Sequence, residues 1–312
     1  ITTTNSNATG IYVANTSNIV TINNTGTIST SGASANAIYV IGAANITNSG
    51  TICAGTMSSG NCVSPGSSLA IAIDNNPNTN RTVITNSVGG VISAPGNFAI
   101  SSTQLPGIDI KNYGTISTGG AIAINFSSGN TTSNNSVTMY GGSTLIGGIA
   151  FNTGTTAETL NFNGYVNSNF NNTITGLNII NVTNGANVTM SSSSGYNLVS
   201  GQISVDATSN LVISGVISDQ TTPIFAASSI YKTGDGMLSL TAANTYTGGT
   251  VVAGGTLGLG NSAALGTSSL SMNDGTTLRA LASLNLANAI NLSGNSTIDT
   301  NGYPVTLSGV MS

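Results

Sequence analysis

Residues 232–260, which read KTGDGMLSLTAANTYTGGTVVAGGTLGLG, decide the fold class. Three short runs in this stretch, residues 237–240, 250–253 and 256–259, alternate apolar residues with small polar ones. Alternation with a period of two is the pattern of a β-strand. The intervening residues, which accept the positive φ of tight turns, include Asn244, Gly248, Gly249, Gly254 and Gly255. The stretch therefore predicts three strands joined by two turns, with no segment long enough for a helix.

The first half of the chain carries a repeat of its own. Residues 24–28 (NTGTI) recur as residues 48–52 (NSGTI) and 112–116 (NYGTI), and a looser copy begins at Asn86. Each copy is preceded and followed by a separate strand-like piece, such as residues 37–40 after the first copy and residues 44–46 before the second. The first two copies start 24 residues apart, and periods of 20 to 50 residues indicate solenoids. We therefore predict an all-β fold, a single-stranded parallel β-helix with three sides, in which each strand pairs with its counterpart one coil away.

The same spacing predicts how the chain is organised. We expect residues 1–200 to form coils of about 24 residues, with a cysteine-containing loop inserted at residues 53–80. We expect residues 201–312 to continue the same solenoid with a second type of strand repeat. Residues 211–218 (LVISGVIS) are echoed by residues 305–312 (VTLSGVMS), so we expect the sequence to be cut off inside a repeat and to continue in a longer product.

The string NTYTGGT at residues 244–250, followed by a short strand and GGTLGLG at residues 254–260, resembles the strand repeat of autotransporter passenger domains from Gram-negative bacteria. The resemblance is close over residues 232–260, and the flanking segments look like further pieces of the same repeat. It implies a right-handed parallel β-helix that is secreted through the outer membrane and displayed on the cell surface. It also implies an outer-membrane barrel in the full-length product.

The composition agrees with stacked strands and excludes several classes of protein. Charged residues make up 4% of the chain, against about 25% in ordinary soluble proteins, and apolar residues make up 39%. Like charges one coil apart would repel each other, whereas columns of Thr, Ser and Asn are neutral, and Asn columns can hydrogen-bond along the stack. The net charge of −4 argues against nucleic acid as a partner, and no run is apolar for the ~18 residues that a membrane span needs.

The two cysteines, Cys53 and Cys62, lie in the segment ICAGTMSSGNC. A local disulfide formed in an oxidising compartment fits this Gly- and Ser-rich loop. A zinc site is poorly supported, because the sequence contains no His and four ligands are normally needed. A reactive thiol pair is the remaining alternative, although no charged neighbour is present to lower a thiol pKa.

Residues that could carry catalysis are scarce and scattered. A Ser-His-Asp triad is excluded by the absence of His, and no two carboxylates share a motif. We interpret Glu158, the single glutamate, as a solvated turn residue, and Asp235 as a turn residue rather than a calcium ligand. Tyr246 is expected to pack at a corner, with ligand stacking as the alternative. The cations are Arg81, Lys111, Lys232 and Arg279. We therefore expect no catalytic, cofactor or metal site.

These observations lead to a functional hypothesis. We expect an extracellular segment on the bacterial cell surface that acts as an adhesin or a self-associating structural protein. Its partners would be other copies of itself or host and abiotic surfaces. The alternative is a subunit of an extracellular filament or surface coat, assembled by end-to-end stacking of β-helices. A polysaccharide-degrading enzyme on the same fold is the least favoured hypothesis.

Overall fold

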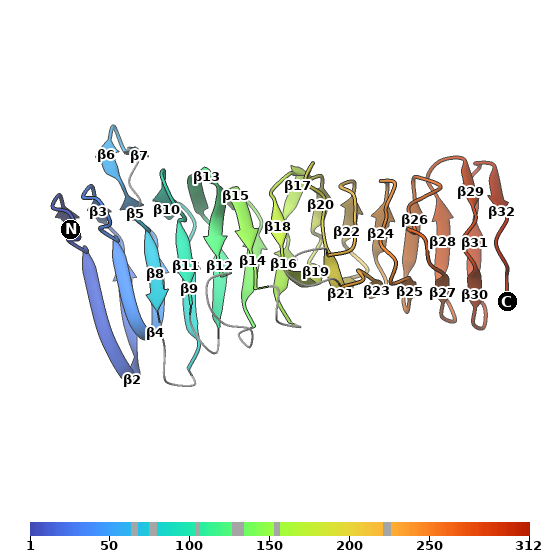
Figure 1. The fold of residues 1–312 in the computed structure, drawn as a ribbon, viewed down its shortest axis with the longest axis horizontal. Coiled ribbons are helices and arrows are strands. Elements are labelled where there is room, and N and C mark those ends of the chain that lie inside the picture. Colours follow the sequence, from blue (N-terminus) through green and yellow to red (C-terminus); the bar gives the residue numbers. More distant parts are fainter. Residues whose placement is uncertain (64–67, 75–79, 104–106, 127–133, 153–156, 221–225) are drawn as a thin grey trace. The chain divides into compact units, whose positions relative to one another are not determined.

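The computed structural model describes residues 1–63, 68–74, 80–103, 107–126, 134–152, 157–220 and 226–312 (Figure 1). All regular secondary structure in these residues is β-strand, and no helix is found among them. The chain divides into two compact units, which consist of residues 1–158 with 172–175, and residues 159–171 with 176–312. The segments predicted as 1–200 and 201–312 stay predictions, and residues 64–67 and 75–79 of the predicted insertion lie outside the described residues.

The first unit contains β1 to β15 and β18. Their bounds are β1 Thr2–Thr3, β2 Ile11–Asn24, β3 Thr27–Thr30, β4 Ile38–Asn48, β5 Thr51–Ala54, β6 Thr56–Ser58, β7 Asn61–Val63, β8 Ile71–Asp74, β9 Thr82–Asn86, β10 Val91–Ala94, β11 Ile100–Ser102, β12 Ile108–Asn112, β13 Thr115–Asn125, β14 Ser136–Tyr140, β15 Thr144–Ala150 and β18 Ile174–Thr175.

Three walls of parallel strands enclose the core of the first unit. The first wall begins with residues 11–15 of β2, which pair with residues 38–42 of β4 and then with β8. The second wall begins with residues 20–24 of β2, which pair with residues 44–48 of β4, followed by β9, β12 and β14. The third wall is formed by β3, β5, β10, the first part of β13 and the first part of β15. The predicted three-sided parallel β-helix is therefore confirmed in this unit.

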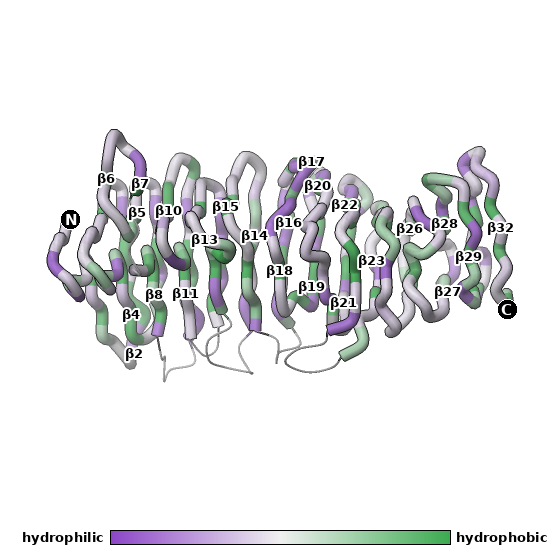
Figure 2. Tube along the Cα trace, turned by 45° about the horizontal axis from the view of Figure 1, so that its top comes forward, coloured by the Kyte–Doolittle hydropathy of each residue, from purple (hydrophilic) through white to green (hydrophobic). Residues whose placement is uncertain are grey.

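Inward-facing side chains stack in columns along each wall. In the third wall, one inward-facing column is apolar and consists of Ile28, Ile52, Ile92, Ile116 and Leu145, each at most 7% exposed. The residues before and after each member of the column are Thr, Ser, Cys, Val or Ile and point outward. Figure 2 shows the resulting alternation of apolar and polar segments along the strands. Burial of branched apolar columns supplies the main favourable term for this fold.

Some strands are longer than the sequence predicts. The pieces predicted at residues 37–40 and 44–46 belong to a single strand, β4, and β2 and β13 also continue through a corner. At the corner within β4, Gly42 has a φ of 115°, which an L side chain rarely adopts. Glycine therefore turns the chain from the first wall to the second without ending the strand.

The second unit contains β16, β17 and β19 to β32. Their bounds are β16 Thr159–Asn163, β17 Val166–Phe170, β19 Leu177–Thr183, β20 Asn187–Met190, β21 Leu198–Val205, β22 Asn210–Ile213, β23 Ile230–Thr233, β24 Met237–Leu240, β25 Thr250–Val252, β26 Thr256–Leu259, β27 Leu270–Met272, β28 Thr277–Ala280, β29 Leu284–Leu286, β30 Ile290–Leu292, β31 Thr297–Asp299 and β32 Val305–Leu307.

The second unit is also a parallel solenoid, and its coils differ in length. One wall runs β16, β19, β21, β23, β25, β27 and β30, and a second runs β17, β20, β22, β24, β26, β28 and β31. On a third side, β29 pairs with β32. Asn181 bonds Asn161 at a separation of 20 residues, whereas Asn24 bonds Asn48 at a separation of 24 in the first unit.

Candidate functional surface

A ladder of buried asparagines runs along one corner of the first unit. Asn24 donates from Nδ2 to Oδ1 of Asn48 over 2.8 Å, and Asn48 donates in the same way to Asn86 over 2.9 Å. Asn86 then donates to Asn112 over 2.9 Å, and each of the four side chains is at most 7% exposed. These are the first residues of the repeat copies in the sequence. The predicted hydrogen bonding of Asn columns along the stack is therefore confirmed here.

Each ladder amide also holds the turn that follows it. Asn48, for example, donates from Nδ2 to the backbone carbonyl oxygens of Gly50 and Val91, each over 3.1 Å. A buried carbonyl without a donor is costly, and the Asn side chain removes that cost at a corner where the strand ladder is interrupted. The turn after the Asn corner is held in a similar way in successive coils, because an Asn side chain at this corner bonds backbone groups of the turn each time.

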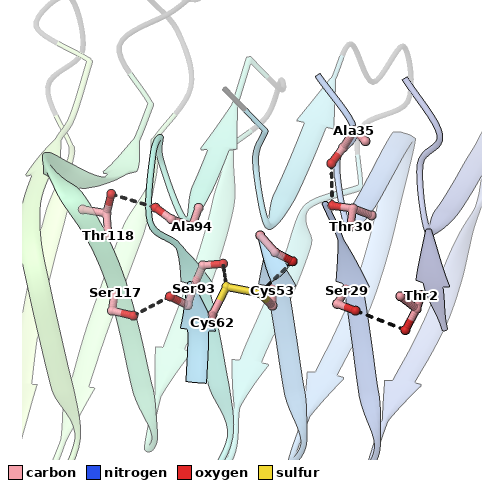
Figure 3. Close-up of a disulfide and its surroundings, with 11 residues drawn as sticks. Thr2, Ser29, Thr30, Ala35, Cys53, Cys62, Ser93, Ala94, Ser117 and Thr118 are labelled. Atoms are coloured by element: carbon pink, nitrogen blue, oxygen red, sulfur yellow. Dashed lines mark hydrogen bonds between the residues drawn. A yellow bond between two sulfur atoms is a disulfide. The ribbon is translucent and has the colours of Figure 1, made fainter. Parts of the chain in front are cut away.

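The outer surface of the third wall carries two rows of small side chains. One row is Thr27, Thr51, Val91, Thr115 and Thr144, and the other is Thr2, Ser29, Cys53, Ser93, Ser117 and Ile146. In the second row, the hydroxyls of Thr2 and Ser29 lie 3.2 Å apart, and Ser117 donates to Ser93 over 2.9 Å (Figure 3). Neighbouring members of each row are separated by the strand spacing of about 4.8 Å. Thr27 and Thr144 are exposed, whereas Ser29 and Ser93 are buried.

A short hairpin lies on this wall. It is formed by β6 and β7, which are antiparallel and joined through Ser59 and Gly60, whose φ angles are 49° and 80°. Cys53, in the wall, forms a disulfide with Cys62 of β7, and the Sγ atom of Cys62 lies 3.5 Å from the carbonyl oxygen of Ser93 (Figure 3). Two positive φ angles suit a two-residue turn. Cys53 has no exposed surface, so the hairpin covers the wall at this point.

In the second unit, the residues predicted from NTYTGGT are either side chains buried inside the coil or glycines in tightly packed turns. Asn244 is buried, accepts from the Ile217 amide over 2.8 Å and donates to the Ala264 carbonyl over 2.6 Å. Tyr246 is fully buried, and its hydroxyl lies 2.6 Å from Oγ1 of Thr250. Burial raises the pKa of Tyr246 to about 12, because the tyrosinate would lose its hydration. Both side chains are therefore occupied inside the coil.

The glycines of this segment permit close stacking of successive turns. Gly249 and Gly255 have φ angles of 81° and 67°, and a Cβ on Gly255 would lie 2.5 Å from the carbonyl oxygen of Gly234. A Cβ on Gly248 would lie 2.5 Å from the carbonyl oxygen of Ser228. Side chains at these positions would separate one coil from the next. The Gly-Gly pairs are thus a packing requirement of a short coil.

Residues 230–259 match the passenger-associated-transport-repeat family. This passenger repeat comprises β23, β24, β25 and β26, with the turns between them. Together with the parallel β-solenoid, it fits an autotransporter passenger domain, as the sequence resemblance predicts. Searches of the curated proteins and of the solved structures gave no significant match.

The passenger repeat contains a buried lysine that the sequence analysis did not single out. Lys232 is fully buried and faces inward, in register with Ile203 on one side and Val252 on the other. Its Nζ donates to the carbonyl oxygens of Thr233, Gly234 and Gly254 over 2.7 to 2.9 Å. The period of two, with Ile230 buried and Tyr231 exposed, is the signal that could have found it.

Burial dominates the electrostatics of Lys232. Loss of hydration lowers its pKa from 10.5 to about 8, and the nearby charge of Asp235 opposes this change. The three carbonyl oxygens use all three ammonium protons, so the group closes the turns of two successive coils. The Lys232 ammonium group is therefore occupied by structural bonds inside the coil.

Carboxylates outside the passenger repeat are engaged in structural bonds. Asp109 accepts from Arg81 at 2.7 Å and from the Ser136 hydroxyl at 2.7 Å; burial opposes ionisation, but these bonds lower the pKa of Asp109 overall. Asp219 accepts from the amides of Ser228 and Thr247. No group of three or more His, Cys, Asp or Glu side chains that could hold a metal ion occurs among the described residues.

Glu158 corrects one interpretation from the sequence. It is completely buried rather than solvated, and it accepts bonds from the backbone nitrogen of Asn135 over 2.9 Å and from Nδ2 of Asn135 over 3.1 Å. The sequence around Glu158 resembles a turn, and nothing local to it shows that Asn135, one coil earlier, brings two donors to the same point. A buried carboxylate that receives two such bonds is a structural group.

Exposed aromatic side chains lie on the outside of the first unit. Tyr12 is 60% exposed and stacks on Tyr39, with ring centroids 5.6 Å apart. The Tyr39 hydroxyl donates to Oδ2 of Asp74 over 3.0 Å, and burial together with this bond raises the Tyr39 pKa. Tyr113 and Tyr140 form a second pair, with centroids 3.9 Å apart. Exposed tyrosines combine a large apolar face with a polar tip, as contact residues often do.

No helix long and apolar enough to cross a membrane occurs in the part of the chain that the structure describes. The outward-facing groups described above are mainly hydroxyls and amides, with a few exposed tyrosines and one disulfide-linked hairpin.

Proposed function

We propose that this chain is a non-catalytic passenger segment on the bacterial cell surface, and that it binds surfaces or other copies of itself. The passenger-associated-transport-repeat family implies surface display or secretion. The observation that carries the proposal is the outer surface of the third wall, where two rows of mainly Thr and Ser side chains run from coil to coil and contain no charged residue. Such a surface makes many weak contacts, because each hydroxyl contributes little after the loss of its hydration.

The mechanism depends on number rather than on a deep pocket. Stacked coils repeat the same side chains along a wall, and neutral rows produce no repulsion when two copies approach. Display of many copies on one cell multiplies the weak contacts, since the second and later contacts are made at a high effective concentration. Exposed Tyr12, stacked on Tyr39, supplies a larger contact face on the first unit.

Bacteria that express the intact precursor test the proposal. They should settle faster in an autoaggregation assay, or bind host cells or plastic better, than a strain without the precursor. Equal behaviour of the two strains in both assays contradicts the proposed function. Discrete fibres in electron micrographs of the purified chain would favour the filament alternative, and turnover of a polysaccharide would favour an enzyme.

A charge-addition variant makes the test specific to the third wall. Thr144 and Ile146 are exposed at its surface, so Thr144→Lys with Ile146→Lys places two positive charges on the neutral rows. Cells with this variant should aggregate less at low salt and recover at high salt, because salt screens the added repulsion. Ser193→Lys with Ser194→Lys adds the same charge to an exposed turn of the second unit and serves as the matched control.

A further inference from the structure

The hairpin formed by β6 and β7 has two outer strand edges. Its register pairs Ser58 with Asn61, Met57 with Cys62 and Thr56 with Val63. In a hairpin with a two-residue turn, the residues that flank the turn exchange both hydrogen bonds, and the next pair exchanges none. The N–H and C=O groups of Met57 therefore point away from β7, toward the outer edge of β6. No other strand pairs with β6 in the described part of the chain.

A groove lies along the outer edge of β6. It has a volume of about 320 Å³, and it is bounded by Gly55, Thr56 and Met57 on the hairpin side. Its floor is the outer surface of the third wall, including Thr2, Thr27 and Ser29. The volume is at the low end for ligand sites, so it admits a short extended segment rather than a folded ligand. A similar groove of about 250 Å³ lies along β7, above Val91 and Ser93.

The chemistry of the groove defines the occupant. None of its described lining residues carries a charge, and the lining has no aromatic ring on which a sugar could stack. What it offers is one backbone donor and one backbone acceptor in an extended strand, above a floor of hydroxyl and methyl groups. Natural proteins usually guard such an edge with Lys, Pro or a bulge, and β6, which reads Thr-Met-Ser, has none of these guards.

The disulfide makes this edge a fixed feature. Cys62 is tied to Cys53 in the wall, and the Cys62 sulfur also contacts the Ser93 carbonyl. A two-stranded hairpin alone is marginal in water, whereas this one is held against a rigid wall. The edge is thus already extended before a partner arrives, and little conformational entropy is lost on binding.

We propose that the groove beside β6 binds an extended, uncharged polypeptide segment by strand addition to the outer edge of β6. The segment pairs with the N–H and C=O of Met57, and its small side chains lie on Thr27 and Ser29. The Met57 side chain, which is half-buried and flexible, adapts to the neighbouring residue of the segment. Two backbone bonds give weak binding to a single site, so display in many copies is needed for strong attachment. The proposal extends the proposed function by naming a contact site and its kind of partner.

Titration of the oxidised protein with a blocked peptide tests the site. The probe is an acetylated, amidated hexapeptide, TISTGG, which is uncharged and has alternating small side chains. It should bind saturably, slow hydrogen exchange at the Met57 amide and shift the Met57 methyl resonance. Met57→Pro, which removes the outward N–H at an edge position that tolerates proline, should weaken binding at least tenfold. Met57→Leu keeps the N–H and should bind like the wild type.

A second pair of variants guards against a hairpin that fails to form. Thr27→Lys puts a charged side chain on the groove floor and should also weaken binding at least tenfold. Thr144→Lys makes the same change in the same outer row, away from both grooves, and should have no effect. A thiol assay establishes that the disulfide is intact in each variant.

The remaining outcomes overturn the proposal. The proposal fails if the peptide does not bind, or if Met57→Pro and Thr27→Lys bind it as well as the wild type does. It also fails if maltohexaose, a sugar probe, binds in place of the peptide and its binding is weakened by these same variants. Aggregation of cells that carry Met57→Pro separates the two proposals. If Met57→Pro abolishes peptide binding but the cells aggregate normally, the groove binds peptide and self-association occurs elsewhere. The comparison with the strain that lacks the precursor tests the proposed function alone.

Discussion

Asn48 and Asn86 lie 38 residues apart in the chain, and Nδ2 of Asn48 donates to Oδ1 of Asn86 over 2.9 Å in the interior of the first unit. The neighbouring bond from Asn24 to Asn48 spans 24 residues and has nearly the same length. The hairpin and its disulfide account for part of the extra chain between Asn48 and Asn86. The ladder therefore keeps its register although one coil is much longer than the next.

Removal of one ladder member should destabilise the first unit. Asn86→Ala deletes the donor to Asn112 and to the carbonyl oxygens of Gly90 and Thr115, which leaves buried acceptors unsatisfied. We expect a loss of roughly 2–4 kcal/mol in the free energy of unfolding, measured by urea denaturation. Asn291→Ala, at an exposed position, is the control and should change this free energy by less than about 0.5 kcal/mol. Equal losses in the two variants would contradict a structural role for the buried ladder.

Lys232 should make the protein more stable as the pH rises above 8. Its pKa is lowered to about 8 in the folded chain from 10.5, so the unfolded chain binds more protons between these values. The free energy of unfolding should therefore increase from pH 8 to 9.5 in guanidinium titrations. Lys232→Met should abolish most of this increase. A wild-type profile that falls across that range would show that the three carbonyl bonds outweigh the loss of hydration.

Above pH 10 the tyrosines reverse the trend. Burial raises the pKa values of Tyr196 and Tyr246 to about 12, so the folded chain binds more protons than the unfolded chain between pH 10 and 12. Stability contributed by the neutral phenols is present below pH 10 and is lost as the pH rises through 12. The stability maximum of the wild type is accordingly expected near pH 10. Tyr246→Phe should lessen the alkaline loss, although it also removes the bond to Thr250.

Two adjacent glycines of the passenger repeat should respond differently to alanine. Gly255 has a φ of 67°, and an added Cβ would lie 2.5 Å from the Gly234 carbonyl oxygen, so Gly255→Ala should cost roughly 1–3 kcal/mol. Gly254 has no such φ, and its nearest neighbour would be 3.3 Å away. Gly254→Ala should therefore cost about 1 kcal/mol or less. Thermal unfolding of the two variants in parallel checks the difference, and a reversed order would refute the assigned geometry.

Loss of the disulfide should release the hairpin while the wall stays folded. Serine occupies the equivalent outer positions at Ser29 and Ser93, so Cys53→Ser continues the row, and Cys62→Ser removes the other thiol. Amide exchange of residues 56–63 should accelerate by more than tenfold in the double variant, whereas exchange in β5 and β10 should change little. Limited proteolysis should cut the hairpin of the double variant first. Protection of residues 56–63 that equals the wild type would mean that wall contacts alone hold the hairpin.

The sequence predicts the coil because the features that define it are local or repeated. Copies of the Asn motif at residues 24, 48, 86 and 112 identify the corner, and the structure places these residues in one ladder. The two strands predicted at residues 237–240 and 256–259 are β24 and β26. Alternation, glycine and spacing are visible in one chain, so fold and register follow from them.

Features that depend on a neighbouring coil were harder to predict. Glu158 looks solvated in sequence, and its burial follows from two donors on Asn135. Lys232 occupies an inward-facing position of its strand, but a charged side chain is usually expected at the surface. Its burial is explained by three carbonyl oxygens of the turns, which accept bonds from its Nζ. The grooves beside the hairpin depend on how β6 and β7 fold back over the wall, which a motif search does not reveal.

The unequal coil between Asn48 and Asn86 has an evolutionary and practical consequence. Each ladder asparagine bonds the asparagine of the neighbouring coil, whatever the length of chain between them. Extra residues can therefore be inserted between two ladder asparagines without a change in the buried core. The position of the hairpin is thus a natural grafting point, at which new exposed peptides can be acquired or engineered one at a time. The scaffold would be inherited unchanged while its outward-facing cargo diversifies.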